Sequence, residues 1–301
     1  MATAHTNGAL NGAAHHEIDE TDSTTTRRRP WEILENGGIA PLNQSSPGRP
    51  QNSSPTVDEA LNTFERQYYP SKPKSLSGIA VRSLLVGIVL TVSVQSTIYL
   101  LFLAPSPLWR IPFFISSLAI FHFLEFWVTA AYNTPAAQIS SFLFSGNGSA
   151  YNIAHSTAIL ECLLTNLFFP NRSLLPPAVH LPILLLGFFL ILLGQTIRTM
   201  AMMEAGTNFN HIVQYTKART HSLVTSGIYG YLRHPSYFGF FWWGLGTQMV
   251  LGNPICFLGY TVALWRFFNR RIKGEEALLV KFFGDEYVDY RQRTVVGIPF
   301  A

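Results

Sequence analysis

Long stretches without charged residues dominate the chain from residue 83 onward. Ser83–Ala104 has 22 residues and no charge, and a helix needs about 20 apolar residues to cross a bilayer. Ile111–Ala131, Ala150–Phe169 and Ala178–Ile197 are further apolar runs. Only 13% of all residues are charged, against about 25% in an ordinary soluble domain. These features predict an all-α, polytopic integral membrane protein. They exclude a soluble globular enzyme, a wholly disordered protein and a nucleic-acid binder with a basic face.

A fifth apolar region has a turn in its middle. Tyr237–Leu264 is 28 residues long without a charge, but Gly252-Asn253-Pro254 interrupts it. This combination of residues favours a turn, so we expect a short helical hairpin with arms of about 11 to 15 residues. Such arms reach only about 17–22 Å, less than the roughly 30 Å hydrocarbon core. The chain is therefore expected to hold about six apolar helical segments, including the hairpin.

Composition also divides the chain into three regions. Residues 1–78 are polar and rich in Ser, Thr and Pro, which predicts a disordered cytosolic tail. A short helix around Val57–Tyr69 is the one element that its pattern allows. The first residues of the tail lack a basic stretch followed by an apolar one, so we do not expect a signal peptide. Residues 79–200 are expected to form four transmembrane helices. Residues 201–301 hold the hairpin, a C-terminal helix and the polar segments in which chemistry is expected.

The distribution of lysine and arginine predicts the orientation in the membrane. These residues collect before the first apolar run, between the fourth run and the hairpin, and after the hairpin. The connections after the first and third runs hold one arginine each, Arg110 and Arg172. Because loops on the cytosolic side carry the excess of Lys and Arg, the three basic segments are expected to face the cytosol. Chemistry is then expected in residues 198–236 and 266–301.

Several ionisable residues lie inside the apolar runs, where burial is costly. His122 and Glu125 are three positions apart, share a helix face and could pair, and His155 and Glu161 are candidate partners on the next run. We favour a structural hydrogen-bonded network that holds helices together. A proton relay or half a metal site is the alternative interpretation.

Motifs for metal and nucleotide chemistry are missing from the sequence. Cys162 and Cys256 lie in apolar runs, without the spacing of a disulfide framework or a zinc site. The sequence has no GxSxG elbow, HExxH or P-loop, and we expect no metal ion. Gly244-Leu245-Gly246 lacks the strand and the acidic residue of a dinucleotide fingerprint. Close packing of helices explains it better.

The most informative region is Gly206–Ala301, where polar and aromatic residues alternate beside the hairpin. Pro235 suits the first turn of a helix, whose free N–H groups near His234 and Ser236 could hold an anion. Arg271 and Glu275 are four positions apart, on one helix face just outside the hairpin. Taken one by one, such residues would also suit an interfacial anchor at the lipid headgroups.

Taken together, the strings of this region are more specific. GTNFNHIV, THSLVTSGIYGYLRHPSYFGFFWWGLGTQ, NPIC, WRFF, FFGDEYVDY and the terminal GIPF resemble the isoprenylcysteine carboxyl methyltransferase family. The resemblance covers about the last 100 residues closely and the multi-span layout loosely, and the N-terminal tail lies outside it. It implies methyl transfer from S-adenosyl-L-methionine to the C-terminal carboxylate of a farnesyl- or geranylgeranyl-cysteine in CaaX-processed proteins. It also implies a multi-pass protein of the endoplasmic reticulum membrane, with membrane lipid but no nucleic acid as a partner and with its active face in the cytosol.

The resemblance also assigns site residues, and it makes residues 201–301 the catalytic region with a cofactor-binding loop. Arg271 matches the arginine at the substrate carboxylate. The chain reads RRIKGEE where the family often has a longer acidic run, which leaves Arg270 and Glu276 as alternatives to Arg271 and Glu275. The positions that match cofactor-binding residues are Gln214, His221, Ser222, Leu223, Val224, Tyr229, His234, Pro235, Ser236, Tyr237 and Glu275.

Two other functions stay open at this point. A phospholipid-headgroup (amine) methyltransferase of the same superfamily would share the RHPxYxG core and the paired glutamates, but the NPIC and WRFF strings argue against it. A non-enzymatic membrane lipid-binding protein could use the polar residues inside the apolar runs.

Overall fold

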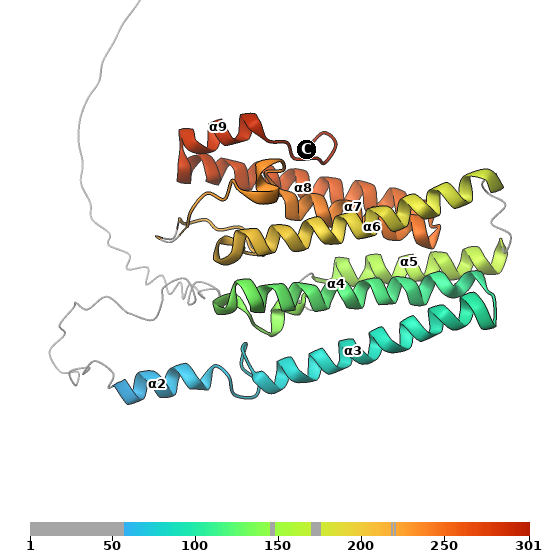
Figure 1. The fold of residues 1–301 in the computed structure, drawn as a ribbon, viewed down its shortest axis with the longest axis horizontal. Helices are drawn as coiled ribbons and strands as arrows, with labels where there is room; N and C mark the ends of the chain where they lie inside the picture. Colours follow the sequence, from blue (N-terminus) through green and yellow to red (C-terminus); the bar gives the residue numbers. More distant parts are fainter. Residues whose placement is uncertain (1–56, 145–147, 170–175, 218, 220) are drawn as a thin grey trace, which may run out of the picture. The chain divides into compact units, whose positions relative to one another are not determined.

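The computed structural model describes residues 57–144, 148–169, 176–217, 219 and 221–301, which lie in one compact unit, Pro55–Ala301. The described residues form helices joined by loops, and their single β-bridge joins Leu232 to Val295, so the all-α prediction is confirmed for them. Figure 1 shows α3 to α8 running roughly alongside one another. The α-helices are α2 (Val57–Arg66), α3 (Leu76–Ile98), α4 (Arg110–Tyr132), α5 (Gly148–Phe168), α6 (Pro177–Ala205), α7 (Pro235–Leu251), α8 (Pro254–Phe283) and α9 (Asp285–Arg293).

Three segments of the described chain are long and apolar enough to cross a membrane. They are Leu76–Leu103, Pro107–Tyr132 and Ala178–Asn208, and they contain the first, second and fourth apolar runs. The third run forms α5, whose 21 residues suffice in length. Polar residues such as Asn152, His155 and Glu161 lower its hydropathy, so it is not among these candidate spans.

The expected tail of residues 1–78 contains helical segments in its described part. Residues 57–66 form α2 and residues 76–78 begin α3, so the boundary predicted at residue 78 lies within a helix. Ser75 caps α3, because its hydroxyl accepts a hydrogen bond from the backbone N–H of Gly78 at 3.1 Å. The rest of the expected tail lies outside the described residues.

The hairpin is present, but its arms are longer than expected. Gly252 ends α7 with φ 72° and ψ 45°, a left-handed conformation that suits glycine, and Pro254 occupies the first turn of α8. The two arms have 17 and 30 residues. Charged residues end the apolar run after Leu264, yet Arg, Lys and Glu are good helix formers. The helix therefore continues through them to Phe283.

The polar residues inside the helices do link neighbouring helices, but with other partners than the sequence suggested. His122 Nε2 lies 3.0 Å from the Tyr151 hydroxyl of α5, and no hydrogen bond joins it to Glu125 in the described chain. His155 Nδ1 lies 2.7 Å from the Tyr260 hydroxyl of α8. The part of the chain that the structure describes has no cluster of His, Cys, Asp and Glu suited to a metal ion.

Glu161 was a candidate partner of His122 and Glu125, but its hydrogen-bond partners in the described chain are different. Its two carboxylate oxygens accept the backbone N–H groups of Ile255 and Cys256, at 2.8 Å and 2.6 Å. Glu161 of α5 therefore caps the start of α8, where a carboxylate also interacts favourably with the helix dipole.

Glycines let α6 and α7 approach until their backbones touch. A Cβ atom on Gly194 would lie 2.5 Å from the carbonyl oxygen of Gly239, and one on Gly239 would lie 2.5 Å from that of Gly194. A Cβ on Gly246 would lie 2.8 Å from the carbonyl oxygen of Gly187. Each helix thus contributes two glycines seven residues apart, which is the repeat of a continuous helix–helix contact. The packing interpretation of Gly244-Leu245-Gly246 is confirmed.

This glycine contact predicts a clear difference in stability between two Gly→Ala variants. Gly239→Ala places a methyl group against the backbone of α6, which cannot move aside without separating the helices. We expect a loss of about 1–3 kcal/mol in stability, seen as a lower thermal unfolding midpoint in detergent. Gly259 of α8 has nothing within 4 Å of its Cβ position, so Gly259→Ala should be neutral or stabilising by about 1 kcal/mol. Equal midpoints for the two variants would refute the close contact.

Candidate active site

The start of α7 forms one wall of the candidate site. α7 begins at Pro235, with His234 as the preceding cap residue, which confirms the helix start predicted from proline. His234 and Ser236 are both 6% exposed. The ring of His234 stacks on the ring of Tyr237, with centroids 5.4 Å apart and planes 5° from parallel. The first turn of α7 therefore presents a fixed pair of aromatic side chains.

Tyr237 joins Arg271 to Glu275. The Arg271 Nε atom donates to the Tyr237 hydroxyl at 2.7 Å, and this hydroxyl donates to Glu275 Oε2 at 2.5 Å. The guanidinium carbon of Arg271 also lies 5.4 Å from the Tyr237 ring centroid and 5.9 Å from that of Phe267. The structure thus brings together three predicted site residues from α7 and α8, one cationic, one anionic and one aromatic.

The neighbours of this trio have different surroundings. Arg270 is exposed, whereas Glu276 faces the loop before α7. Glu276 Oε1 accepts a hydrogen bond from Arg233 Nε at 2.6 Å and lies 3.4 Å from His234 Nε2. Burial raises the pKa of Glu276, but its contacts with His234 and Arg233 outweigh this effect and lower the pKa to about 2. Glu276 is therefore engaged within the protein, which favours Glu275 as the carboxylate available to a ligand.

An open groove of about 590 Å³ runs along α8 beside this trio. It lies where the apolar half of α8 gives way to the charged half, so its lining combines apolar side chains with three arginines and one carboxylate. The lining residues are Val213 and Tyr215 from the loop after α6, and Ala263, Arg266, Phe267, Arg270, Arg271, Gly274, Glu275 and Leu278 from α8.

Residues at the end of α6 and just after it form hydrogen bonds with the loop that carries Ser222 and Tyr229. The Ser222 backbone N–H donates to Asn208 Oδ1 at 3.0 Å, and Asn208 Nδ2 donates to the Ser222 hydroxyl at 3.3 Å. Ser226 donates to Glu204 Oε1 at 2.5 Å, and the Tyr229 hydroxyl donates to a main-chain carbonyl of α6 at 3.3 Å. The sequence interpretation did not single out Asn208 or Glu204, and only the GTNFNHIV string contains a signal for Asn208.

The remaining predicted cofactor residues lie in the loop between α6 and α7. Gln214 Nε2 donates to the carbonyl oxygen of Ile212 at 3.2 Å. His221, Leu223 and Val224 are half-buried. Among the described residues, no hydrogen bond connects these four side chains to the trio of Tyr237, Arg271 and Glu275.

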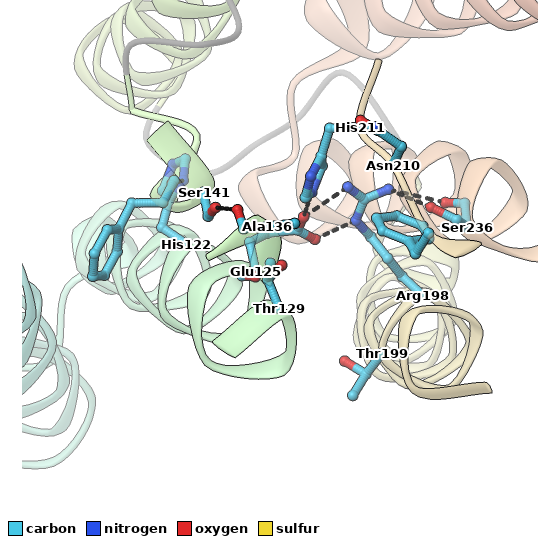
Figure 2. Close-up of polar contacts among 12 residues, drawn as sticks. His122, Glu125, Thr129, Ala136, Ser141, Arg198, Thr199, Asn210, His211 and Ser236 are labelled. Atoms are coloured by element: carbon cyan, nitrogen blue, oxygen red, sulfur yellow. Dashed lines mark hydrogen bonds and ion pairs between the residues drawn. The ribbon is translucent and has the colours of Figure 1, made fainter. Parts of the chain in front are cut away.

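Ser236 is held by a buried arginine. Arg198 of α6 is 7% exposed, and its Nη1 donates to the hydroxyl and the carbonyl oxygen of Ser236 at 2.8 Å and 3.2 Å. Its Nε and Nη2 donate to the two carboxylate oxygens of Glu125, which is 1% exposed. His211 Nε2 lies 2.8 Å from the same carboxylate, and Figure 2 shows this cluster. Arg198 is thus a buried residue of α6 that belongs to this network.

The pKa of Glu276 predicts a pH dependence of stability. Because folding lowers this pKa from 4.5 to about 2, the charged carboxylate stabilises the folded state above about pH 4.5. This contribution is lost as the pH falls toward 2. The thermal unfolding midpoint should therefore fall less between pH 5 and about pH 3 for Glu276→Gln than for the unmodified protein. Glu286→Gln, at an exposed glutamate of α9, serves as the control. Identical slopes for all three proteins would show that the ion pairs of Glu276 do not stabilise the fold.

Comparison with known proteins identifies the family. The model of the isoprenylcysteine carboxyl methyltransferase (ICMT) family matches residues 185–281. The protein-S-isoprenylcysteine O-methyltransferase of Saccharomyces cerevisiae is 46% identical over 188 residues, covering 62% of this chain and 78% of the yeast protein. The Rattus norvegicus protein of the same name is 39% identical over 222 residues, covering 74% of each. A solved structure of the eukaryotic intramembrane Ras methyltransferase ICMT has a TM-score of 0.68 and 34% identity, covering 82% of this chain and 87% of that one. The chain belongs to the isoprenylcysteine carboxyl methyltransferase family.

Proposed function

We propose that this membrane enzyme transfers a methyl group from S-adenosyl-L-methionine to the C-terminal carboxylate of a farnesyl- or geranylgeranyl-cysteine in CaaX-processed proteins. Family membership supports the reaction class, since its curated relatives are named protein-S-isoprenylcysteine O-methyltransferases. The observation that carries the assignment of residues is the trio of Arg271, Tyr237 and Glu275 beside the groove on α8.

Arg271 is suited to hold the acceptor carboxylate. Its guanidinium has five N–H donors, of which Tyr237 and the carbonyl oxygen of His211 each take one. Among the described residues Nη1 has no hydrogen-bond partner, so it can donate to a carboxylate in the groove, and charge strengthens such a bond. A C-terminal carboxylate has a pKa near 3.5 and is ionised at neutral pH, so the reaction needs no general base.

The residues around the trio fit a cationic methyl donor. Glu275 supplies a carboxylate acceptor, and His234 Nε2 is buried without an aligned hydrogen-bond partner in the described chain. We assign the donor to these residues, to the first turn of α7 at Pro235, Ser236 and Tyr237, and to the loop residues Gln214, His221, Ser222, Leu223, Val224 and Tyr229. The donor supplies an activated methyl group. The protein must hold it in line with the carboxylate oxygen at about 3–3.5 Å and exclude water.

The groove also explains how a lipid-anchored acceptor reaches the site. Ala263 and Phe267 line its apolar end, while Arg271 and Glu275 line its charged end. The prenyl chain would lie against the apolar end, and the charged donor would enter from the cytosol. The excess of Lys and Arg in residues 198–236 and 266–301 supports a cytosolic active face. We place the enzyme in the endoplasmic reticulum membrane with α3 to α8 as its six apolar segments.

Substitutions at Arg271 and Glu275 should separate the two substrates. Arg271→Ala should lower kcat/KM for a farnesyl-cysteine acceptor about 10- to 150-fold, because a lost charged hydrogen bond is worth roughly 1.5–3 kcal/mol. Arg271→Lys should recover only part, since a point charge cannot replace the planar guanidinium. Glu275→Gln should instead weaken binding of the donor. The measurement is steady-state kinetics with each substrate varied in turn, using labelled S-adenosyl-L-methionine.

Lys273 provides the control, because it is an exposed cation of α8 outside the groove lining, and Lys273→Ala should leave both substrates unaffected. If Arg271→Ala loses donor affinity while acceptor use is unchanged, the assignment fails and Arg270 becomes the next candidate. Transfer of label to a phospholipid amine, with none to the farnesyl-cysteine analogue, would replace the proposed reaction by headgroup methylation.

The proposed orientation can be tested with single cysteines in a variant that lacks Cys162 and Cys256. Lys217→Cys, in the exposed loop after α6, should react with an impermeant maleimide added to sealed microsomes. Leu108 lies in the connection between α3 and α4 and is 36% exposed. A cysteine in its place, Leu108→Cys, should react only after the membranes are opened. The reverse pattern would overturn the cytosolic placement of the site.

A further inference from the structure

The position of Arg271 depends on a residue outside the predicted site. Arg271 Nη2 donates to the carbonyl oxygen of His211 at 2.5 Å, while its Nε is held by Tyr237. Two of the contacts that orient the guanidinium therefore come from different parts of the chain, α7 and the loop after α6. Any movement of the His211 main chain would redirect the side of Arg271 that faces the groove.

The loop around His211 is fastened to α4 at two points. Nε2 of His211 lies 2.8 Å from Oε2 of Glu125, and the side chain of Asn133, at the end of α4, donates to the carbonyl oxygen of Phe209 at 2.9 Å. Figure 2 shows the imidazole of His211 directed at the Glu125 carboxylate. Because Phe209 and His211 both contact residues of the same helix or its end, the carbonyl group of His211 has a defined position.

Glu125 in turn has a fixed position. It is 1% exposed, and Arg198 holds both of its oxygens. The same arginine holds Ser236, the residue before Tyr237. One buried ion pair therefore positions both contacts of Arg271, the His211 carbonyl through the loop and Tyr237 through the first turn of α7.

These residues act at a distance from the reacting atoms. Glu125 is covered by protein, and the polar edge of the His211 side chain is directed at Glu125 rather than at the groove. A displacement of about 1 Å at a reacting group can cost on the order of 100-fold in rate, so such support has a measurable effect on catalysis.

We propose that His211 and Glu125 are positioning residues for the acceptor carboxylate and act through Arg271. This inference rests on the proposed function of Arg271. It assigns a catalytic consequence to Glu125, which lies inside a candidate membrane span. The sequence pointed only to a structural network at this position.

The test is a double-mutant cycle in the full-length enzyme. His211→Ala should raise the acceptor KM about 10-fold and change donor binding less than about twofold, because it frees the carbonyl that holds Arg271 and leaves Glu275 in place. Adding His211→Ala to Arg271→Ala should cause little further loss in acceptor kcat/KM, since residues that act through one contact are not additive. His211→Gln keeps an N–H donor at similar reach and should recover most of the loss.

Two further variants complete the design. Thr216→Ala, at an exposed position of the same loop, should leave the acceptor KM unchanged. Glu125→Gln should raise the acceptor KM in the same manner as His211→Ala, with the thermal unfolding midpoint as the check that the protein is folded. Because His211 lies in a loop and its side chain is 25% exposed, His211→Ala keeps the proposal testable even if Glu125→Gln does not fold.

The outcomes separate this inference from the proposed function. If Arg271→Ala lowers acceptor use and His211→Ala does not, the inference is wrong and the proposed function stands. Additive losses in the double variant, or equal losses for donor and acceptor, would show that the network only stabilises the fold. If Arg271→Ala leaves acceptor use unchanged, the proposed function of Arg271 fails and the inference fails with it.

Discussion

The buried ion pair between Glu125 of α4 and Arg198 of α6 connects the helices that carry the candidate site. Both side chains are nearly inaccessible and both lie in candidate membrane spans, where an unpaired charge would be very costly. The glycine contact between α6 and α7 brings this ion pair close to the candidate site. Gly239 packs against the backbone of Arg198, and Ser236, one turn earlier on α7, therefore comes within reach of the guanidinium.

The ion pair fixes α4, α6 and α7 relative to one another at the candidate site. α4 and α6 contribute the two charges, α7 contributes Ser236, and the loop after α6 joins through His211. α8 is added by contact of Arg271 with His211 and Tyr237. In the proposed reaction, a methyl transfer that needs no proton acceptor depends on alignment, and this set of contacts would provide alignment without a further ionisable group beside Arg271.

Features that depend on local sequence could be predicted, and features that depend on helix rotation could not. Proline and glycine marked the start of α7 and the turn before α8, and the spacing of Arg271 and Glu275 placed them on one face. The partner of Glu125 lies 73 residues away, and which faces of α4 and α6 meet is decided by packing along their whole length. Hydropathy also predicted too early an end for the second arm of the hairpin, because charged residues interrupt an apolar run without interrupting a helix.

The unbroken course of α8 has a consequence for substrate selection. Ala263 and Leu278, at the two ends of the groove lining, are fifteen positions apart, which corresponds to about 22 Å along a helix. A jointed hairpin arm would let the lipid-facing and charged parts of the groove move independently. On one rigid helix, the sites proposed for the prenyl chain and for its carboxylate keep a fixed separation. In the proposed arrangement, an acceptor whose prenyl group sits at the wrong depth would present its carboxylate away from Arg271, so the rigid helix would favour one distance between the prenyl chain and the methyl donor.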